Sequence, residues 1–551
     1  MLVESKIDLW WKNAVIYCLD VEVFLDSNGD GIGDFHGLTE RVDYLAGLGV
    51  TCIWLMPFFP SAQRDDGYDI IDFYGVDSRL GDLGSFTEFI ETAKAHGIKV
   101  IADLVVNHTS NQHPWFQAAR SSPNSPYRNF YIWKDAPPDD PPSLVFPGEQ
   151  TTNWTYDDVA KQYYFHHFYP HQPDLNPASP EVADAIKQIM GFWIQQGIAG
   201  FRVDAVPFLI ELKDEAEVQE MTPHEFLRDL RSFVERRRGD SALLGEVNLL
   251  PHEQVKYFGN DDELEMVFSF YVNQHLFLSL VREDPDPLRK ALDNMPPIPE
   301  SCQWAHFLKN HDEANLDKLT QAEQDEVYKQ FAPQKSMRLY DRGIRRRIPS
   351  MLEGNERKIR MAYSLLFSLP GTPVLFYGEE IGMWENLKVE GRLAVRTPMQ
   401  WKPGPQGGFT TAKPEDAIRA IPTGPSGADG INVMQQRRDP QSMLNWMERL
   451  MRRRKETGEF GFGKSKIIGV GQPSIFALSC DWDGRIVISL HNFSDRAQDA
   501  DISSELPEDV LEVADIWTDG DYPAVEGGKV RLKPYGYRWL RIIKQGQELL
   551  M

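Results

Sequence analysis

The chain has 551 residues, of which 42% are hydrophobic and 25% charged, and its length predicts two or three domains because one hydrophobic core does not grow so large. The formal net charge of −24 argues against a nucleic-acid partner and against adhesion to anionic membranes, since both require clustered Lys and Arg. This acidic balance is compatible with a neutral substrate and with bound cations.

The N-terminal segment, beginning at Met1, lacks the apolar stretch of a signal peptide, and no window of about 18 apolar residues predicts a transmembrane helix. None of the four cysteines forms a CxxC pair or shows zinc-ligand spacing. Cys18 and Cys52 lie in apolar runs and are expected to be buried, inert thiols, which suits a reducing compartment. We therefore expect a cytoplasmic protein without a membrane partner.

A loop rich in oxygen-bearing side chains follows the first apolar run, at 26–34. These side chains occur at alternate positions, and Gly31 permits the sharp turn of an EF-hand loop, although Gly37 replaces the acid expected at the twelfth position. The pattern predicts one structural Ca²⁺, or Mg²⁺, and no organic cofactor; an Asx-turn loop without metal is the alternative. The expected ligands are Asp26, Asn28, Asp30, the carbonyl of Ile32, and Asp34.

Short apolar runs alternate with helix-period stretches along most of the chain. Runs of this kind are typical of parallel strands buried on both faces. Eight βα units in this length predict an α/β fold, a (β/α)₈ TIM barrel. A doubly wound sheet is the alternative, but no GxGxxG follows the first run. The runs lie at 14–18, 50–57, 99–106, 200–205, 242–247, 266–270, 302–308 and 373–377.

Two interruptions and a change of pattern divide the chain into domains. The segment 107–176, rich in Pro, Asn, His and aromatic residues, is too long for a structureless loop and is predicted to be a small domain inserted after the third strand. The barrel then comprises 1–106 and 177–460, with a helical insertion at about 313–356. After about 460 the pattern alternates with period two, which predicts a C-terminal β-sandwich at 461–551.

Polar residues cluster where four of the predicted strands end. The third run leads into Asn107 and His108, and the fourth contains Arg202 and ends at Asp204. The C-terminal ends of barrel strands meet at one face, so these side chains should converge. Ion pairs at the barrel mouth would explain any one acid, but the joint pattern indicates an active site. The other two clusters contain Glu246, and His311 with Asp312.

Cleavage of a glycosidic bond requires two carboxyl groups with different protonation states. One carboxylate attacks the anomeric carbon while the other, as an acid, donates a proton to the leaving oxygen. Arg202 lies two residues before Asp204, hence on the same strand face, and can keep that carboxylate ionised.

The four strand-end segments resemble the four signature regions of glycoside hydrolase family 13, the α-amylase family. The resemblance covers nearly the whole chain and implies retention of configuration. It implies that Asp204 is the nucleophile, Glu246 the general acid/base and Asp312 the transition-state stabiliser. It also implies that the sugar in the reacting subsite is held by His108, Arg202 and His311.

Two further segments resemble the oligo-1,6-glucosidase and trehalose synthase group of that family: the residues 172–176, with the sequence QPDLN, and 65–69, with DDGYD. In that group Tyr68 would stack on a terminal glucose and Asp65 would bond its outer hydroxyls. Arg396 should pair with Asp65 and close the pocket behind one glucose. The implied action is on the ends of small α-glucosides.

Several stretches look closest to trehalose synthases, including 299–304, 343–347 and 535–540. That resemblance implies interconversion of maltose and trehalose through a covalent glucosyl-enzyme, with some hydrolysis. The alternative is an α-glucosidase or transglucosidase, because the chain departs from trehalose synthases at 212–218 and 247–250. A non-catalytic member that partners a transporter is disfavoured by the intact acids. Ala205, after the nucleophile, favours α-1,4 or α-1,1 linkages over α-1,6.

A second Ca²⁺ site is implied by the resemblance alone. Its ligands would come from the third strand end, the fifth signature segment and the loop after strand four. The matching positions are Asn107, Asp174, the carbonyls of Phe208 and Leu209, and Glu211. The sequence does not fix the oligomeric state, and a homo-oligomer is compatible with it.

Overall fold

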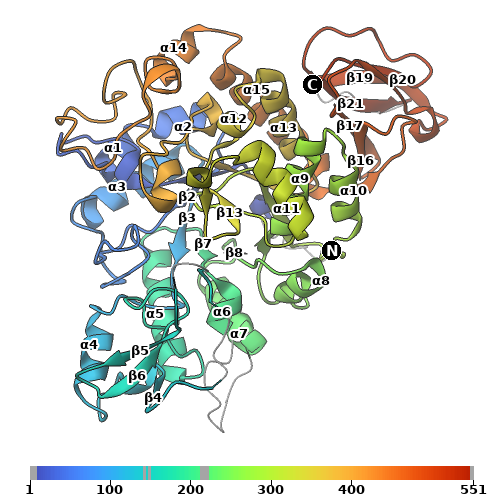
Figure 1. Cartoon of the computed structure of the whole chain (residues 1–551). Coiled ribbons are helices and arrows are strands. Elements are labelled where there is room, and N and C mark those ends of the chain that lie inside the picture. Colours follow the sequence, from blue (N-terminus) through green and yellow to red (C-terminus); the bar gives the residue numbers. More distant parts are fainter. Residues whose placement is uncertain (1–8, 140–143, 147–149, 211–222, 546–551) are drawn as a thin grey trace.

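The computed structural model describes residues 9–139, 144–146, 150–210 and 223–545 (Figure 1). Eight parallel strands form a closed barrel in which neighbours follow the chain order and the last strand pairs with the first. Each predicted apolar run overlaps one of these strands, so the (β/α)₈ barrel is confirmed and the doubly wound sheet is wrong. The strands are β1 (Ile16–Leu19), β2 (Cys52–Leu55), β3 (Lys99–Leu104), β7 (Gly200–Val203), β8 (Ala242–Gly245), β9 (Met266–Phe268), β10 (Gln303–Phe307) and β14 (Thr372–Phe376).

The helices surround the barrel because each has one apolar face to bury against the strands. In α3 (Leu83–Ala95), Phe86, Phe89 and Ile90 are buried at helical spacing. Asp82 caps the start of α3, and Gly97, at φ +70°, follows its end, where glycine favours a helix stop. The other main helices of the barrel are α2 (Val42–Leu48), α5 (Pro180–Gln195), α7 (Pro223–Arg237), α9 (Phe270–Arg282), α13 (Glu356–Ser368) and α15 (Met443–Lys455).

Shorter helices fill the connections between these elements. They are α1 (Phe35–Thr39), α4 (Pro114–Ser121), α6 (Val206–Ile210), α8 (Pro251–Gln254), α10 (Asp286–Asp293), α14 (Val433–Arg438) and α16 (Glu459–Phe462). Within the described ranges, no helix combines the length and the apolar character needed to cross a membrane.

The segment between β3 and α5 forms a small sheet of its own. Its three antiparallel strands run in the order β4 (Trp133–Lys134), β6 (Gln162–Phe165) and β5 (Trp154–Asp157). Ile132, Trp154 and Phe165 make a separate hydrophobic cluster behind it. This sheet and α4 lie at the lower end of the molecule in Figure 1, below the barrel.

The segment 313–356 was predicted to be helical, and it contains α11 (Gln321–Phe331) and α12 (Ile348–Met351). It also contains a three-stranded antiparallel sheet, which the sequence analysis missed. Strands of two residues are too short to show an alternating pattern, so this sheet has no sequence signature. Its strands are β11 (Ala314–Asn315), β12 (Arg338–Leu339) and β13 (Gly343–Ile344).

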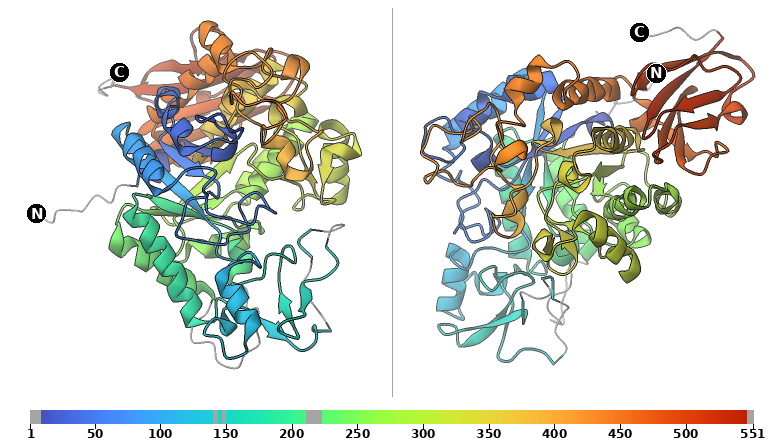
Figure 2. Two further views of the ribbon diagram at one scale, coloured as in Figure 1. Left: turned by 90° about the vertical axis from the view of Figure 1, so that its left-hand side faces the viewer. Right: turned by 45° about the horizontal axis from the view of Figure 1, so that its top comes forward.

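From residue 464 to 545, where the described residues end, the regular structure is β apart from one short 3₁₀ turn, as predicted. A five-stranded and a two-stranded sheet bury Leu490, Val530 and Leu540 in a core separate from that of the barrel. Figure 2 shows this part beside the barrel, at the opposite end from the inserted sheet. Its strands are β15 (Lys464–Ile467), β16 (Ile475–Trp482), β17 (Arg485–Asn492), β18 (Gln498–Asp501), β19 (Val510–Thr518), β20 (Lys529–Leu532) and β21 (Tyr537–Lys544).

Candidate active site

The two acids predicted to perform the chemistry, Asp204 and Glu246, both form ion pairs with the same arginine. Asp204 directly follows β7 and Glu246 directly follows β8, while Arg202 lies within β7. The Arg202 Nη1 atom lies 2.6 Å from Asp204 Oδ1, and its Nη2 atom lies 2.8 Å from Glu246 Oε2. The Arg202 side chain is 1% exposed, so its charge must be balanced by carboxylates in contact with it. The guanidinium therefore fixes both acids side by side at the barrel mouth.

The residue after the nucleophile candidate also contacts the second acid. Ala205 adopts φ +48°, an uncommon conformation for a residue with a side chain. Its backbone N–H donates to Glu246 Oε2 over 3.1 Å. Uncommon backbone conformations of this kind cluster at functional sites, where the surrounding structure maintains them.

Asp103, inside β3, contacts the same Nη1 atom of Arg202 as Asp204 does. Arg202 Nη1 donates to Asp103 Oδ1 over 2.7 Å, and Trp54 Nε1 and the Tyr68 hydroxyl donate to Asp103 Oδ2 over 3.2 and 3.1 Å. Burial raises the pKa of Asp103, and the charge of Arg202 opposes that shift. The sequence did not identify Asp103 as a site residue, because it lies within the third apolar run and not after its end.

The predicted sugar-binding residues form a second connected group. The Tyr68 hydroxyl lies 2.7 Å from His311 Nε2, and the two rings are nearly parallel, at 4°. His108 Nε2 lies 3.0 Å from the Tyr68 carbonyl. Burial holds the pKa of His311 well below its usual range, so its ring is neutral at pH 7. The structure thus brings Tyr68, His108 and His311 to the same face as the two acids.

Asp312 is held between two arginines. Its Oδ1 atom lies 3.2 Å from Arg392 Nε and 3.0 Å from Arg396 Nη2. Burial raises the pKa of Asp312, but the charges of Arg392 and Arg396 outweigh it and hold that pKa well below its usual range. Asp312 is therefore ionised near neutral pH. Arg392, in the 3₁₀ turn Gly391–Val395, was missed, because nothing in its local sequence distinguishes it from a surface arginine.

The two acids have different affinities for a proton. Burial raises the pKa of Asp204 to about 6, with the charge of Arg202 opposing it. Burial raises the pKa of Glu246 to about 7, and the neighbouring charges of Asp204 and Asp312 add to that rise. Near neutral pH, Asp204 is therefore the carboxylate and Glu246 the acid, the division of roles that glycosyl transfer requires.

This difference predicts a bell-shaped dependence of kcat/KM on pH. Activity should rise as Asp204 ionises, near pH 6, and fall as Glu246 loses its proton, near pH 7. Initial rates on an aryl α-glucoside between about pH 5 and pH 9 measure both limbs. A flat profile across this range would contradict the assignment of the two acids.

The expected ion pair between Arg396 and Asp65 is wrong. Arg396 Nη1 lies 2.5 Å from Asp66 Oδ2, while Asp65 Oδ2 accepts a hydrogen bond of 2.8 Å from Gln172 Nε2. Asp66 adopts φ +50°, which turns its carboxylate away from that of Asp65. Burial raises the pKa of Asp65 to about 6. Asp65 is therefore hydrogen-bonded to the neutral amide of Gln172, and the carboxylate of Asp66 forms the ion pair with Arg396.

A cavity of about 290 Å³ opens beside Glu246 and Asp312. A larger cavity of about 830 Å³ is lined by Asp65 and Arg396. Arg392 lines both, so its side chain stands between them. The wall of the smaller cavity combines polar and charged residues with a set of larger apolar ones, Val145, Phe146, Phe168, Phe208, Leu249 and Phe270.

The loop predicted to bind Ca²⁺ is curled by its own side chains. Asp26 accepts hydrogen bonds from the backbone N–H groups of Asn28, Gly29 and Gly31, over 3.0, 2.6 and 2.8 Å. Asp34 Oδ1 accepts from the Gly37 N–H over 2.7 Å and so caps α1. These bonds hold the loop closed. Both carboxylate oxygens of Asp26 already accept two hydrogen bonds each, the second one on Oδ2 coming from the Thr410 hydroxyl, so a bound cation would have to replace some of these bonds.

Further expected ligands are Asn28, Asp30 and Ile32. Asn28 Oδ1 accepts from the Asp30 N–H, and Asp30 Oδ1 from the Ile32 N–H, both over 2.9 Å. Carboxylate, amide and carbonyl oxygens are the donor set that Ca²⁺ prefers.

Four of the five residues expected to form the second cation site lie within the described part of the chain. Asn107 Nδ2 lies 3.2 Å from Asp174 Oδ2, and both residues are fully buried. His167 Nδ1 lies 2.6 Å from the same oxygen, and its ring lies 4.7 Å from that of Phe208. Phe208 and Leu209 are in α6, next to this group. Glu211 lies outside the described residues.

Comparisons with known proteins agree with this geometry. The family model of the alpha amylase catalytic domain matches residues 19–461, and that of the sucrose hydrolase-like C-terminal domain matches 484–541. A trehalose synthase of Pimelobacter sp. is 37% identical over 97% of this chain and 96% of its own length. One of Thermus thermophilus is 41% identical over 96% of this chain, which spans only 55% of that relative's length. The crystal structure of an alpha-amylase from H. orenii superposes with a TM-score of 0.78 at 28% identity, covering 97% of this chain and all of the other.

Proposed function

The chain belongs to the alpha-amylase family of glycoside hydrolases, and we propose that it interconverts maltose and trehalose by retaining glucosyl transfer. The observation that carries the proposal is the contact of Arg202 with both Asp204 and Glu246, with Asp312 ionised nearby. The trehalose synthases among its relatives support the substrate assignment.

In the first half of the reaction, an Asp204 oxygen attacks the anomeric carbon of a bound glucosyl unit. The glycosidic bond breaks as Glu246 gives its proton to the leaving oxygen, and free glucose forms beside a glucosyl ester of Asp204. Positive charge develops on the sugar ring in the transition state, and the ionised Asp312 stabilises it. Tyr68, His108 and His311 would hold that ring.

In the second half, a hydroxyl of the released glucose attacks the glucosyl ester. Glu246, now a carboxylate, takes the proton of that hydroxyl, and Asp204 leaves as a carboxylate. Attack by the anomeric hydroxyl gives trehalose, attack by the 4-hydroxyl gives maltose, and attack by water gives two glucose molecules. The ratio of these products depends on how well the site excludes water. Phe146 and Tyr340, stacked at 4.5 Å, and Arg392 over both rings would provide that exclusion.

The test is a product time course by ¹³C NMR, with maltose in one tube and trehalose in another. The proposal predicts that each disaccharide yields the other, with little free glucose. If free glucose dominates from the first time points, the enzyme is an α-glucosidase and isomerisation is not its function.

An α-glucosidase is the second candidate, because two residues of the cavity wall that would face an acceptor sugar offer it few hydrogen bonds. Asn248 and Leu249 line the cavity beside Glu246. Leu249 offers no hydrogen bond, and the Asn248 amide already donates to Asp317 over 3.3 Å. An acceptor glucose that gains few hydrogen bonds from this part of the wall would leave sooner and allow water to react.

We also propose that the loop 26–34 binds Ca²⁺ through Asp26, Asn28, Asp30, the Ile32 carbonyl and Asp34, where it would stabilise the fold without entering the reaction. Chelation with EGTA should lower Tm by a few degrees, and added Ca²⁺ should restore it, because a ligand that binds only the folded state stabilises it. Asp30→Ala should abolish this dependence if the loop is the site. An unchanged Tm with no bound metal in the purified protein would contradict the proposal.

A second Ca²⁺ is proposed at Asn107, Asp174, the carbonyls of Phe208 and Leu209, and Glu211. The buried contact between Asn107 and Asp174 supports it.

A cytoplasmic location is supported by the four cysteines, which are buried and unpaired within the described residues.

A further inference from the structure

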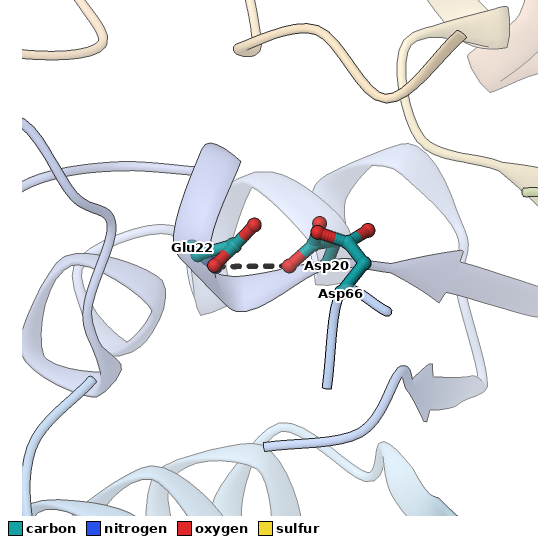
Figure 3. Close-up of side chains that lie close together, drawn as sticks. All are labelled: Asp20, Glu22 and Asp66. Carbon is teal, nitrogen blue, oxygen red and sulfur yellow. Dashed lines mark hydrogen bonds between the residues drawn. The ribbon is translucent and has the colours of Figure 1, made fainter. Parts of the chain in front are cut away.

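Three acidic side chains meet at the barrel mouth, next to the candidate active site. Asp20 and Glu22 follow β1, and Asp66 lies in the loop after β2. Their carboxylate oxygens lie within 4.8 Å of one another, and Figure 3 shows Asp20 between the other two. Asp20 and Glu22 are buried, and the side chain of Asp66 is 10% exposed. So close a group of buried carboxylates needs a cation.

The protein supplies that cation itself, from a distant part of the chain. Arg419, in the segment after β14, contacts all three acids: Nη1 lies 3.2 Å from Asp20 Oδ2, and Nη2 bonds with Glu22 Oε1 and Asp66 Oδ1. Its side chain is 6% exposed. The guanidinium thus fills the position that a metal ion would take, and the acids do not form an open metal site.

Two contacts connect Arg419 to Arg396. Arg419 Nη1 donates to the Arg396 carbonyl over 2.9 Å, and Asp66 bonds with Arg419 through Oδ1 and with Arg396 through Oδ2. Arg396 in turn donates to the His311 carbonyl over 2.9 Å and contacts Asp312 over 3.0 Å. An unbroken series of charge-assisted bonds therefore runs from Arg419 through Asp66 and Arg396 to Asp312.

We propose that Arg419 is a positioning residue, which fixes Asp66 and Arg396 and through them the orientation of Asp312 in the reaction proposed above. Arg419 touches neither Glu246 nor Asp204 in the described structure, so its effect on the reaction is indirect. Removing this guanidinium while the acids remain leaves three carboxylates facing one another without a cation. Their electrostatic repulsion is then reduced if they bind protons or move apart. Either change loosens Arg396.

The charged groups that face Arg419 determine how the effect of its removal on activity depends on pH. Asp20, Glu22 and Asp66 face it from the loops after β1 and β2, and Tyr377 and Arg396 face it from the segment after β14. Arg79 pairs with Glu22 from the outer side, over 3.3 Å. Burial raises the pKa of Asp66, but Arg419 and Arg396 outweigh it and the net pKa is low. Without Arg419, Asp66 should hold a proton to a higher pH and release Arg396.

The test is a double-mutant cycle on kcat/KM, with Arg419→Ala, Asp66→Asn and the double variant, measured on an aryl α-glucoside across pH. Each single change should lower kcat/KM by about 10- to 100-fold, mainly through kcat, and the double variant should lose no more than the worse single one, because contacting residues couple. In Arg419→Ala the acid limb of the profile should move to higher pH. Arg419→Lys, or added guanidinium ion, should recover part of the loss, whereas Asp66→Asn should not respond to guanidinium.

Arg538→Ala is the matched control, since Arg538 is fully buried and ion-paired with Asp515 over 2.6 Å in the C-terminal sheet. It should lower Tm and leave the pH profile unchanged. Additive losses in the cycle, or an Arg419→Ala profile identical in shape to that of the wild type, would overturn the proposal. Failure of the wild type to interconvert maltose and trehalose would instead contradict the proposed function, and the cycle on the aryl glucoside would still decide the role of Arg419.

Discussion

Replacing Asp204 by Asn is expected to lower kcat by about 10⁴-fold or more, with little change in substrate binding, because the amide cannot attack the anomeric carbon. The substitution keeps the shape of the side chain, and Arg202 remains held by Asp103 and Glu246. Steady-state rates on an aryl α-glucoside, with stopped-flow detection of any burst, measure the effect. A variant that keeps more than a tenth of the wild-type kcat would show that another group is the nucleophile.

The same variant should be at least as stable as the wild type. The charge of Asp204 raises the pKa of Glu246, and the charge of Asp312 raises the pKa of both, so neutralising Asp204 relieves repulsion between these carboxylates. A Tm equal to or above that of the wild type separates loss of chemistry from loss of fold. Asp515→Asn, which breaks the ion pair with Arg538 in the C-terminal sheet, is the control for a carboxylate that supports only structure.

Replacing Glu246 by Gln should lower kcat/KM on maltose by about 10²- to 10⁴-fold, because the leaving sugar oxygen then departs without a proton. The pKa of Glu246, raised to about 7, places the basic limb of the wild-type profile near neutral pH, and this limb should disappear in the variant. The acid limb, which reports Asp204, should remain.

The choice of substrate makes this prediction sharper. An aryl α-glucoside with an acidic phenol needs little protonation as it leaves, so its first-step rate should fall much less than the rate on maltose. Glucosyl-enzyme should then accumulate and appear as a burst of phenol. Equal losses on the two substrates would mean that Glu246 supports the site without acting as the acid.

The barrel and the positions of the acids could be predicted from the sequence because both follow from local patterns. Strands buried on both faces give continuous apolar runs, and residues directly after such runs must lie at one end of the barrel. Asp204 and Glu246 are directly after β7 and β8, so no knowledge of the side-chain contacts was needed to bring them together.

The partners of the arginines could not be predicted in this way. Arg396 pairs with Asp66 and not with Asp65, because the left-handed conformation of Asp66 decides which of two adjacent carboxylates faces it. Arg392 and Arg419 lie in segments without a regular period, far in sequence from the acids that they contact. Many arginines lie in such segments, and the tertiary packing of the loops determines which of them are buried. Sequence periodicity carries no information about that packing.

The most direct test of the account is to trap the covalent intermediate. A glucosyl fluoride whose ring carries a further fluorine forms the glucosyl-enzyme faster than the ester is broken down, because the added fluorine slows the second half of the reaction and fluoride leaves readily. Mass spectrometry of the intact protein and of its peptides should find one added sugar, attached to Asp204. Turnover of this reagent without any adduct, or an adduct on a different residue, would contradict the mechanism proposed for this chain.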